Sequence, residues 1–165
     1  MFLTVHAASG IFIGSQVSAP WLAFILGFVS HWLLDFIPHG DEKVIDRSKF
    51  SESRLKKMLF YVAAADTLGI IILFYFLIST ETIVLTSGIL WGMLGAVAPD
   101  YLWGLHKITR IRVLKPLHKI HNWFHLKLTN PRYPRLNRGR GLPFKLGSLI
   151  QLAAFIAFFL LIIYL

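Results

Sequence analysis

The sequence predicts an all-α integral membrane protein: a bundle of about five helices with a basic loop that carries a short histidine-rich helix. Two observations predict this class. Hydrophobic residues make up 56% of the 165-residue chain and its mean hydropathy is +0.64, whereas soluble domains contain about 45–50% apolar residues. All 17 Lys and Arg residues fall in the segments 43–57 and 107–145. Their exclusion from the long apolar runs is typical of membrane-protein loops.

The apolar runs predict five helices, over about 2–17, 20–37, 54–78, 82–104 and 143–165. Crossing the hydrocarbon takes about 20 residues. We therefore expect the second to fifth helices to span the membrane, whereas the first is short enough to be re-entrant. Pro38 disfavours helix at the residue before it, and Ser51-Glu52-Ser53 is a candidate N-cap region. The length predicts a single domain, residues 1–165.

The charge distribution predicts the topology. With five spans, both basic segments lie on the side of the N-terminus, and the opposite turns contain only Glu81 as a charged residue. The positive-inside bias then predicts a plasma (inner) membrane protein with cytoplasmic N-terminus and basic loops. We expect no cleaved signal peptide, because the N-terminus lacks a basic region and has His6 in its apolar run. The net charge of +9 does not predict a nucleic-acid partner, since a soluble binder would interleave its cations with its core.

Ionisable residues inside the apolar runs are the candidates for a functional site. A carboxylate in a membrane segment costs several kcal/mol unless a cation or a partner stabilises it, and Asp35, Asp66 and Asp100 are such residues. His31, Asp35 and His39 recur every four residues, which places them on one helix face. The chain contains no cysteine, so a metal ion would be held by imidazole and carboxylate groups. These residues lie at a similar depth on the side of the basic loop.

A shared metal centre at the cytoplasmic helix ends accounts for this pattern. Its predicted ligands are His6, His31, Asp35, His39, Asp66, Asp100, His118, His121 and His125. Such ligands suit zinc, with manganese or iron as alternatives, and their number predicts two or three ions per chain. Paired ions activate water and stabilise both oxygens in a displacement at phosphorus. Asp66, the least clearly committed ligand, is the candidate general base.

Each of these residues also has a simpler interpretation. His6 could be a satisfied structural residue, and His31 with Asp35 could be a hydrogen-bonded pair joining helices. Asp66 could cap a helix or pair with a loop arginine, and Asp100 could begin a turn at a helix end. The three loop histidines, spaced by three and four residues, could belong to an amphipathic helix on the membrane surface.

Three segments resemble a known family: Val-His-Ala-Ala-Ser-Gly (5–10), Gly-Phe-Val-Ser-His-Trp-Leu-Leu-Asp (27–35) and Ala-Pro-Asp-Tyr (98–101). They resemble the membrane-bound metal-dependent hydrolase-like proteins, which include the LexA-regulated inner-membrane family. The His-x-x-x-Asp pair is also similar to one in zinc-dependent phospholipase C. The resemblance implies metal binding by His6, His31, Asp35 and Asp100. In this chain Leu102 stands at the second acid of the family's Pro-Asp-x-Asp motif, and the Ser-His segment comes first.

The function predicted is a metal-dependent hydrolase that cleaves a phosphoester of an anionic membrane phospholipid at headgroup depth. The tract from Arg132 to Arg140 would contact anionic lipids. Two alternatives stay open, a metal ion or proton transporter and a non-catalytic membrane protein with a structural metal. A transporter would distribute its polar residues across the membrane, whereas these cluster on one side. Haem binding is a weaker alternative because three carboxylates lie nearby. No pattern in the sequence predicts an oligomeric state.

Overall fold

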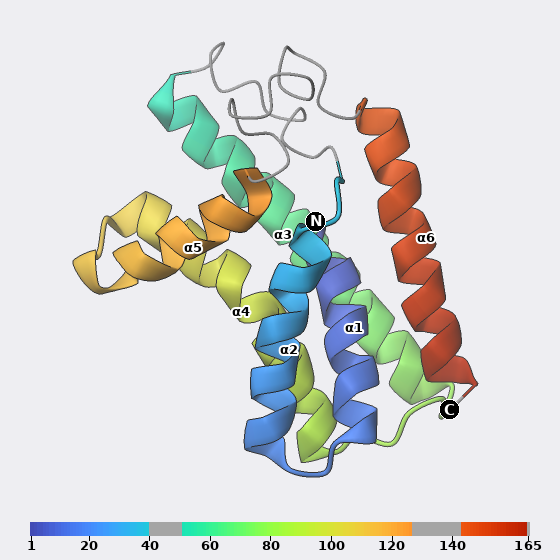
Figure 1. Cartoon of the computed structure of the whole chain (residues 1–165). Coiled ribbons are helices and arrows are strands. Elements are labelled where there is room, and N and C mark those ends of the chain that lie inside the picture. The colour runs from blue at the N-terminus through green and yellow to red at the C-terminus, as the bar shows by residue number, and fades with distance from the viewer. Residues whose placement is uncertain (40–50, 127–142, 165) are drawn as a thin grey trace.

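The computed structural model describes residues 1–39, 51–126 and 143–164 (Figure 1). Of His125 and Leu126 it describes the backbone only, and the predicted lipid-contacting tract from Arg132 to Arg140 lies outside the described residues. Within the described ranges the regular secondary structure is all helical and there is no strand, which confirms the all-α class. The elements are α1 (Leu3–Gln16), α2 (Pro20–Asp35), α3 (Glu52–Ser79), α4 (Ser87–Thr109), the 3-10 turn η3 (Arg112–Leu114), α5 (Lys115–Leu126) and α6 (Phe144–Ile163).

Among the described helices, α3 and α6 are the two that are long and apolar enough to cross a membrane. They have 28 and 20 residues, and only 17% of the most apolar stretch of each is buried. α1 and α2 have 14 and 16 residues. At 1.5 Å per residue these two helices are about 21 and 24 Å long, shorter than the hydrocarbon core of about 30 Å. The other two full spans predicted are therefore not confirmed, since α2 is short and α4 is long enough but less apolar.

α4 departs most from its predicted bounds of 82–104. It begins later because the Thr86 side chain caps it by accepting a hydrogen bond from the third residue beyond, at 3.2 Å. The helix then continues through Pro99 and ends at Thr109. Asp100 therefore lies inside the helix, and the interpretation in which it begins a helix-end turn is wrong. The predicted cap of α3 is confirmed, since the Ser51 side chain accepts a hydrogen bond at 3.4 Å from the backbone N–H of Arg54.

Glycines allow α4 to pack closely against both α1 and α2. A Cβ added to Gly10 of α1 or to Gly27 of α2 would overlap the carbonyl oxygen of Gly92 in α4. A Cβ on Gly92 would in turn overlap the carbonyl oxygen of Gly10, and one on Gly95 would overlap that of Phe24. Backbone therefore meets backbone at this crossing, and small shifts of the three helices relative to one another are sterically blocked.

The charged parts of the described chain gather at one end of the molecule. Figure 1 shows the starts of α1, α3 and α6 and the end of α2 toward the same end. The end of α4 joins the start of α3 through an ion pair between Arg110 Nη2 and Glu52 Oε1, at 3.1 Å. The described cations are Arg54, Lys56, Lys57, Lys107, Arg110, Arg112, Lys115, Lys119 and Lys145. The turn between α3 and α4 contains Glu81 and no cation. The side of a membrane that the charged end faces stays a prediction.

The glycine crossing makes the effect of a single methyl group testable. We expect Gly92→Ala to lower the thermal unfolding midpoint in detergent, because overpacking of this kind costs about 1–3 kcal/mol. Gly104→Ala is the matched control in the same helix, since a Cβ there has nothing within 4 Å. The control should be neutral or slightly stabilising, because alanine favours helix by about 0.5–1 kcal/mol over glycine. Equal midpoints for the two variants would contradict the close packing.

Candidate metal centre

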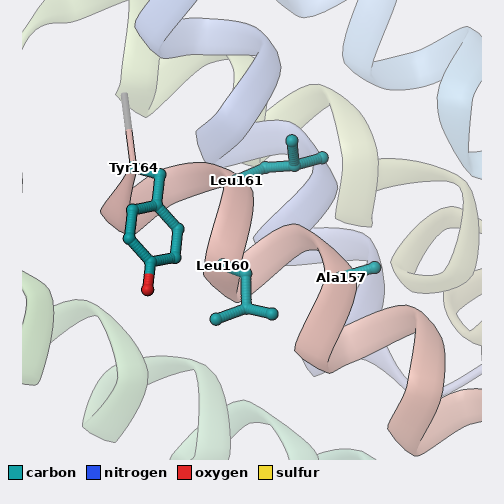
Figure 2. Close-up of a pocket in the computed structure, with 4 residues that line it drawn as sticks. All are labelled: Ala157, Leu160, Leu161 and Tyr164. Carbon is teal, nitrogen blue, oxygen red and sulfur yellow. The ribbon is translucent and has the colours of Figure 1, made fainter.

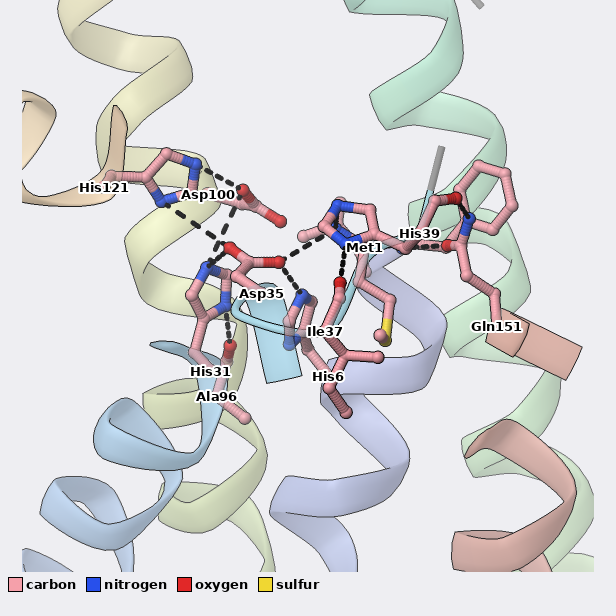
Figure 3. A network of polar contacts seen from close by, with 12 residues as sticks. Met1, His6, His31, Asp35, Ile37, His39, Ala96, Asp100, His121 and Gln151 are labelled. Atoms are coloured by element: carbon pink, nitrogen blue, oxygen red, sulfur yellow. Dashed lines mark hydrogen bonds and ion pairs between the residues drawn. The ribbon is translucent and has the colours of Figure 1, made fainter. Parts of the chain in front are cut away.

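Four side chains from three helices meet at the charged end of the bundle (Figure 3). They are His31 and Asp35 from α2, Asp100 from α4 and His121 from α5, and each offers one ligand atom within 4.8 Å of the others. His31 Nε2 lies 3.0 Å from Asp35 Oδ2 and 3.8 Å from Asp100 Oδ1, which is 3.4 Å from His121 Nε2. Two imidazoles and two carboxylates at this spacing could hold a metal ion. We call these four residues the His–Asp cluster.

Local structure explains how three of the four donors come together. His31 and Asp35 are four residues apart, so they lie on one face in the last turns of α2. Asp100 is brought to them because α4 crosses α2 with backbone contact at Gly27. His31, Asp35 and His121 are buried, with at most 4% of each side chain exposed, whereas 21% of the Asp100 side chain is exposed. Asp100 is therefore the accessible corner of the cluster.

The ring of His31 is held in the orientation that a metal ligand requires. Its Nδ1 lies 2.7 Å from the backbone carbonyl oxygen of Ala96 in α4. A carbonyl only accepts hydrogen bonds, so Nδ1 carries the proton, and Nε2 faces the two carboxylates. A neutral imidazole offers only a lone pair there, and the carboxylates also offer only lone pairs. The arrangement is therefore favourable with a cation between these atoms or with a second proton on His31. Hydrogen bonding of the remote nitrogen to a carbonyl is typical of metal-bound histidine.

His6 and His39, two further predicted ligands, lie beside the cluster but are not among its four donors. His6 Nε2 is 3.2 Å from Asp35 Oδ1, the oxygen opposite the one that faces His31, and the His6 ring stacks on that of His31. The Met1 amino nitrogen is 2.8 Å from the same Asp35 oxygen and 2.7 Å from His39 Nε2. Asp35 thus uses one oxygen for these neighbours and directs the other toward His31.

Asp66, predicted as ligand and general base, is not brought to the cluster. Its carboxylate accepts hydrogen bonds from the backbone N–H groups of Leu3 and Thr4 and from the Thr4 hydroxyl. These are the first residues of α1, whose own N-cap residue, Phe2, has no capping side chain. The carboxylate therefore caps α1 from α3, which matches the simpler interpretation of Asp66 and assigns it a structural role.

The loop histidines separate in the structure. His121 joins the cluster, and the side chain of His125 lies outside the described residues. His118 instead stacks parallel to the indole of Trp103, with ring centroids 6.0 Å apart, and its centroid is 4.7 Å from that of His106. Residues three apart differ by about 60° around a helix, which is enough to aim His118 at the end of α4 and His121 at the acids.

Gln151 is a buried residue at this end that was not predicted. Its Oε1 accepts a hydrogen bond from the backbone N–H of Phe2 at 2.7 Å, and its Nε2 donates to the carbonyl oxygen of His39 at 3.0 Å. It therefore ties α6 to α1 and to the segment after α2. The sequence did contain a signal for this role: Gln151 is a lone amide inside the apolar run of α6, and a buried polar group in such a run needs a hydrogen-bond partner.

A shallow hollow near the C-terminal end of α6 is apolar and separate from the cluster. It is lined by Ala157, Leu160, Leu161 and Tyr164 (Figure 2). Gln151 lies at the level of the cluster, and Tyr164 follows it on the same helix by about 20 Å. The lining contains neither histidine nor carboxylate, so this hollow is not part of the candidate centre.

The capping role of Asp66 predicts a loss of stability with retention of metal. Asp66→Ala removes the acceptor of two backbone N–H groups, and loss of a helix cap costs about 0.5–2 kcal/mol. We expect a lower thermal unfolding midpoint in detergent with unchanged metal content. Thr4→Val tests the same contact from the α1 side and should also lower the midpoint. Loss of metal from a folded Asp66→Ala protein would restore Asp66 as a ligand.

Comparison of the chain with protein-family models, with curated proteins and with solved structures finds no match. The resemblance to membrane-bound metal-dependent hydrolase-like proteins therefore stays a prediction. The three segments that carry it do come together, since they supply His6, His31, Asp35 and Asp100.

Proposed function

We propose that this protein is a metal-dependent membrane hydrolase that cleaves a phosphoester of a membrane lipid. The observation that carries the proposal is the His–Asp cluster, in which His31, oriented by a backbone carbonyl, faces the buried carboxylate of Asp35 and the partly exposed carboxylate of Asp100. We propose zinc as the ion, because two imidazoles and two carboxylates match its ligand preferences. One divalent ion would also balance the charge of the two acids. The nine ligands expected from the sequence suggested two or three ions, whereas the described residues gather four donors.

The four residues of the His–Asp cluster would have two different roles. His31, Asp35 and His121 would hold the ion from buried positions. Asp100 is the partly exposed donor, and we propose that its carboxylate accepts a proton from the attacking water, the role expected of Asp66. A divalent ion bound there supplies Lewis-acid activation of water and of a phosphoryl oxygen.

Two features support a lipid as substrate. The exposed apolar side chains of α3 and α6 suit a hydrocarbon environment, which would place the cluster near one membrane surface. The described cations gather at the same end as the cluster, and basic residues at a membrane surface attract anionic headgroups. A phosphoester at headgroup depth would thus approach Asp100.

Hydrolysis is better supported than transport by the distribution of polar groups. The end of the bundle away from the cluster has an apolar core that includes Ile11, Leu77, Ile83, Ile89 and Ile162. A translocation path would need ionisable residues through this region. The described parts of α1, α2, α4 and α6 place none there.

Metal analysis of the purified protein tests the central claim. We expect stoichiometric zinc in the wild type and its loss in His31→Ala, Asp35→Asn and His121→Ala, because each change removes one of the three residues that would hold the ion. Lys119→Ala is the control on α5, since the Lys119 side chain is exposed, and it should retain the metal. Wild-type protein without stoichiometric metal would contradict the proposal, and so would equal losses in the Lys119 and His121 variants.

The activity is tested by phosphate release from phosphatidic acid in detergent micelles. We expect release by the zinc-loaded protein, loss of release after chelation and recovery when zinc is restored. Asp100→Asn should lower the rate more than the metal content, because the amide cannot accept the proton. Activity that survives complete chelation would contradict the proposed metal-dependent mechanism. Zinc uptake into proteoliposomes without lipid hydrolysis would favour the transporter.

A further inference from the structure

α5 is attached to the rest of the cluster differently from α2 and α4. The three donors on α2 and α4 are fixed by the glycine crossing, where backbone meets backbone. The fourth donor, His121, comes from a helix that follows the end of α4 and the turn η3. The position of His121 therefore depends on side-chain contacts that hold α5 in place.

The ring of His121 also has a different setting from that of His31. His31 is oriented by the carbonyl of Ala96, whereas both ring nitrogens of His121 face acids. Its Nε2 is 3.4 Å from Asp100 Oδ1, and its Nδ1 is 4.0 Å from Asp35 Oδ2. Small rotations of α5 would move both nitrogens relative to the acids, so the ligand geometry at His121 follows the placement of the helix.

Two tryptophans on the core helices contact α5 next to His121. Trp103 Nε1 donates a hydrogen bond at 2.9 Å to Oδ1 of Asn122, and the Asn122 amide nitrogen lies 3.2 Å from a ring nitrogen of His118. On the other side, the indole of Trp32 stacks on Phe124 with an interplanar angle of 3° and centroids 5.6 Å apart. α5 is thus held by α4 through Asn122 and by α2 through Phe124.

The contacts between α4 and α5 form two neighbouring links. Asp100 and Trp103 are three residues apart in α4 and lie on one face, and they face His121 and Asn122, which are adjacent in α5. One link joins the acid to the imidazole, and the other joins the indole N–H to the amide oxygen. The second link therefore sets the separation and rotation of the two helices where the first link forms.

We propose, on the basis of the metal site proposed above, that Asn122 is a positioning residue that Trp103 holds so that His121 reaches the metal. Its amide oxygen accepts from Trp103 of α4, which joins the two helices, and its amide nitrogen faces His118 of the same helix, which orients the amide for that bond. Outer-shell residues that orient a metal ligand contribute about 10- to 100-fold to metal affinity, and we expect an effect in this range from Asn122 through the placement of α5. Asn122 would act through His121 and would not touch the ion.

Titration of the detergent-solubilised full chain with Co²⁺, followed by competition with Zn²⁺, tests this role. Asn122→Leu keeps the approximate volume and removes both polar groups, and we expect about 10- to 100-fold weaker binding of both ions. The visible absorption of the Co²⁺ complex should shift toward that of His121→Ala. Trp103→Phe keeps an aromatic ring and removes the N–H, so it should weaken binding in the same direction. Trp21→Phe, a change at an exposed tryptophan at the start of α2, is the matched control and should bind as the wild type does.

A double-mutant cycle separates positioning from a general loss of stability. If Asn122 acts through His121, Asn122→Leu should cause no further loss of affinity in the His121→Ala background. Additive losses in the two backgrounds would overturn the proposal, and so would wild-type affinity in both Asn122→Leu and Trp103→Phe. Wild-type protein that binds neither Co²⁺ nor Zn²⁺ would instead overturn the metal site itself. The thermal unfolding midpoint of each metal-free variant shows whether that variant folds. If Asn122→Leu has a folding defect, the metal affinity of Trp103→Phe tests the proposal in its place.

Discussion

The backbone contact of α4 with α1 and α2 is the constraint on which the rest of the structure depends. Glycines at the crossing let the carbonyl of Gly92 approach both neighbouring helices, where any side chain would collide. Because the helices cannot slide past one another, the residues beyond the crossing are held in register. His31 then meets Ala96, and Asp100 meets the face that carries Asp35. The geometry of the His–Asp cluster is therefore a consequence of packing one to two turns away from it.

The burial of Asp35 is the property that favours a cation in the cluster. Asp35 is nearly fully buried and has imidazoles on both of its oxygens, His6 on one and His31 on the other. Burying a carboxylate is costly unless a cation or hydrogen-bond donors compensate. The orientation of His31 by a carbonyl directs its remaining nitrogen at the acids and not away from them. A divalent ion between His31, Asp35, Asp100 and His121 would satisfy these four groups together, and this favours a metal site at the cluster.

The structure also separates residues that look equivalent in the sequence. Asp35, Asp66 and Asp100 are all acids in apolar runs, yet Asp66 caps the first turn of α1 while the other two face His31. His118 and His121 lie in one helix and both rings lie beside Trp103, yet only His121 among these two faces Asp35 and Asp100 in the described residues. Depth along the helices was a sound guide to which end of the molecule carries the polar groups. It could not separate these residues, because neighbours at one depth still differ in the direction in which they point.

The sequence by itself determined the helical class, the gathering of charge at one end and the pairing of His31 with Asp35, because these follow from composition and from the helical repeat. It also identified the Ser51 cap of α3, which depends only on neighbouring residues. The tertiary structure alone decided which four of the nine predicted ligands come together, that Asp66 caps α1 and that Gln151 ties α6 to the site. These outcomes depend on which faces of different helices meet. That choice is made by the close approach of backbones at glycines and by the contacts of α5 with Trp32 and Trp103, and no single segment contains it.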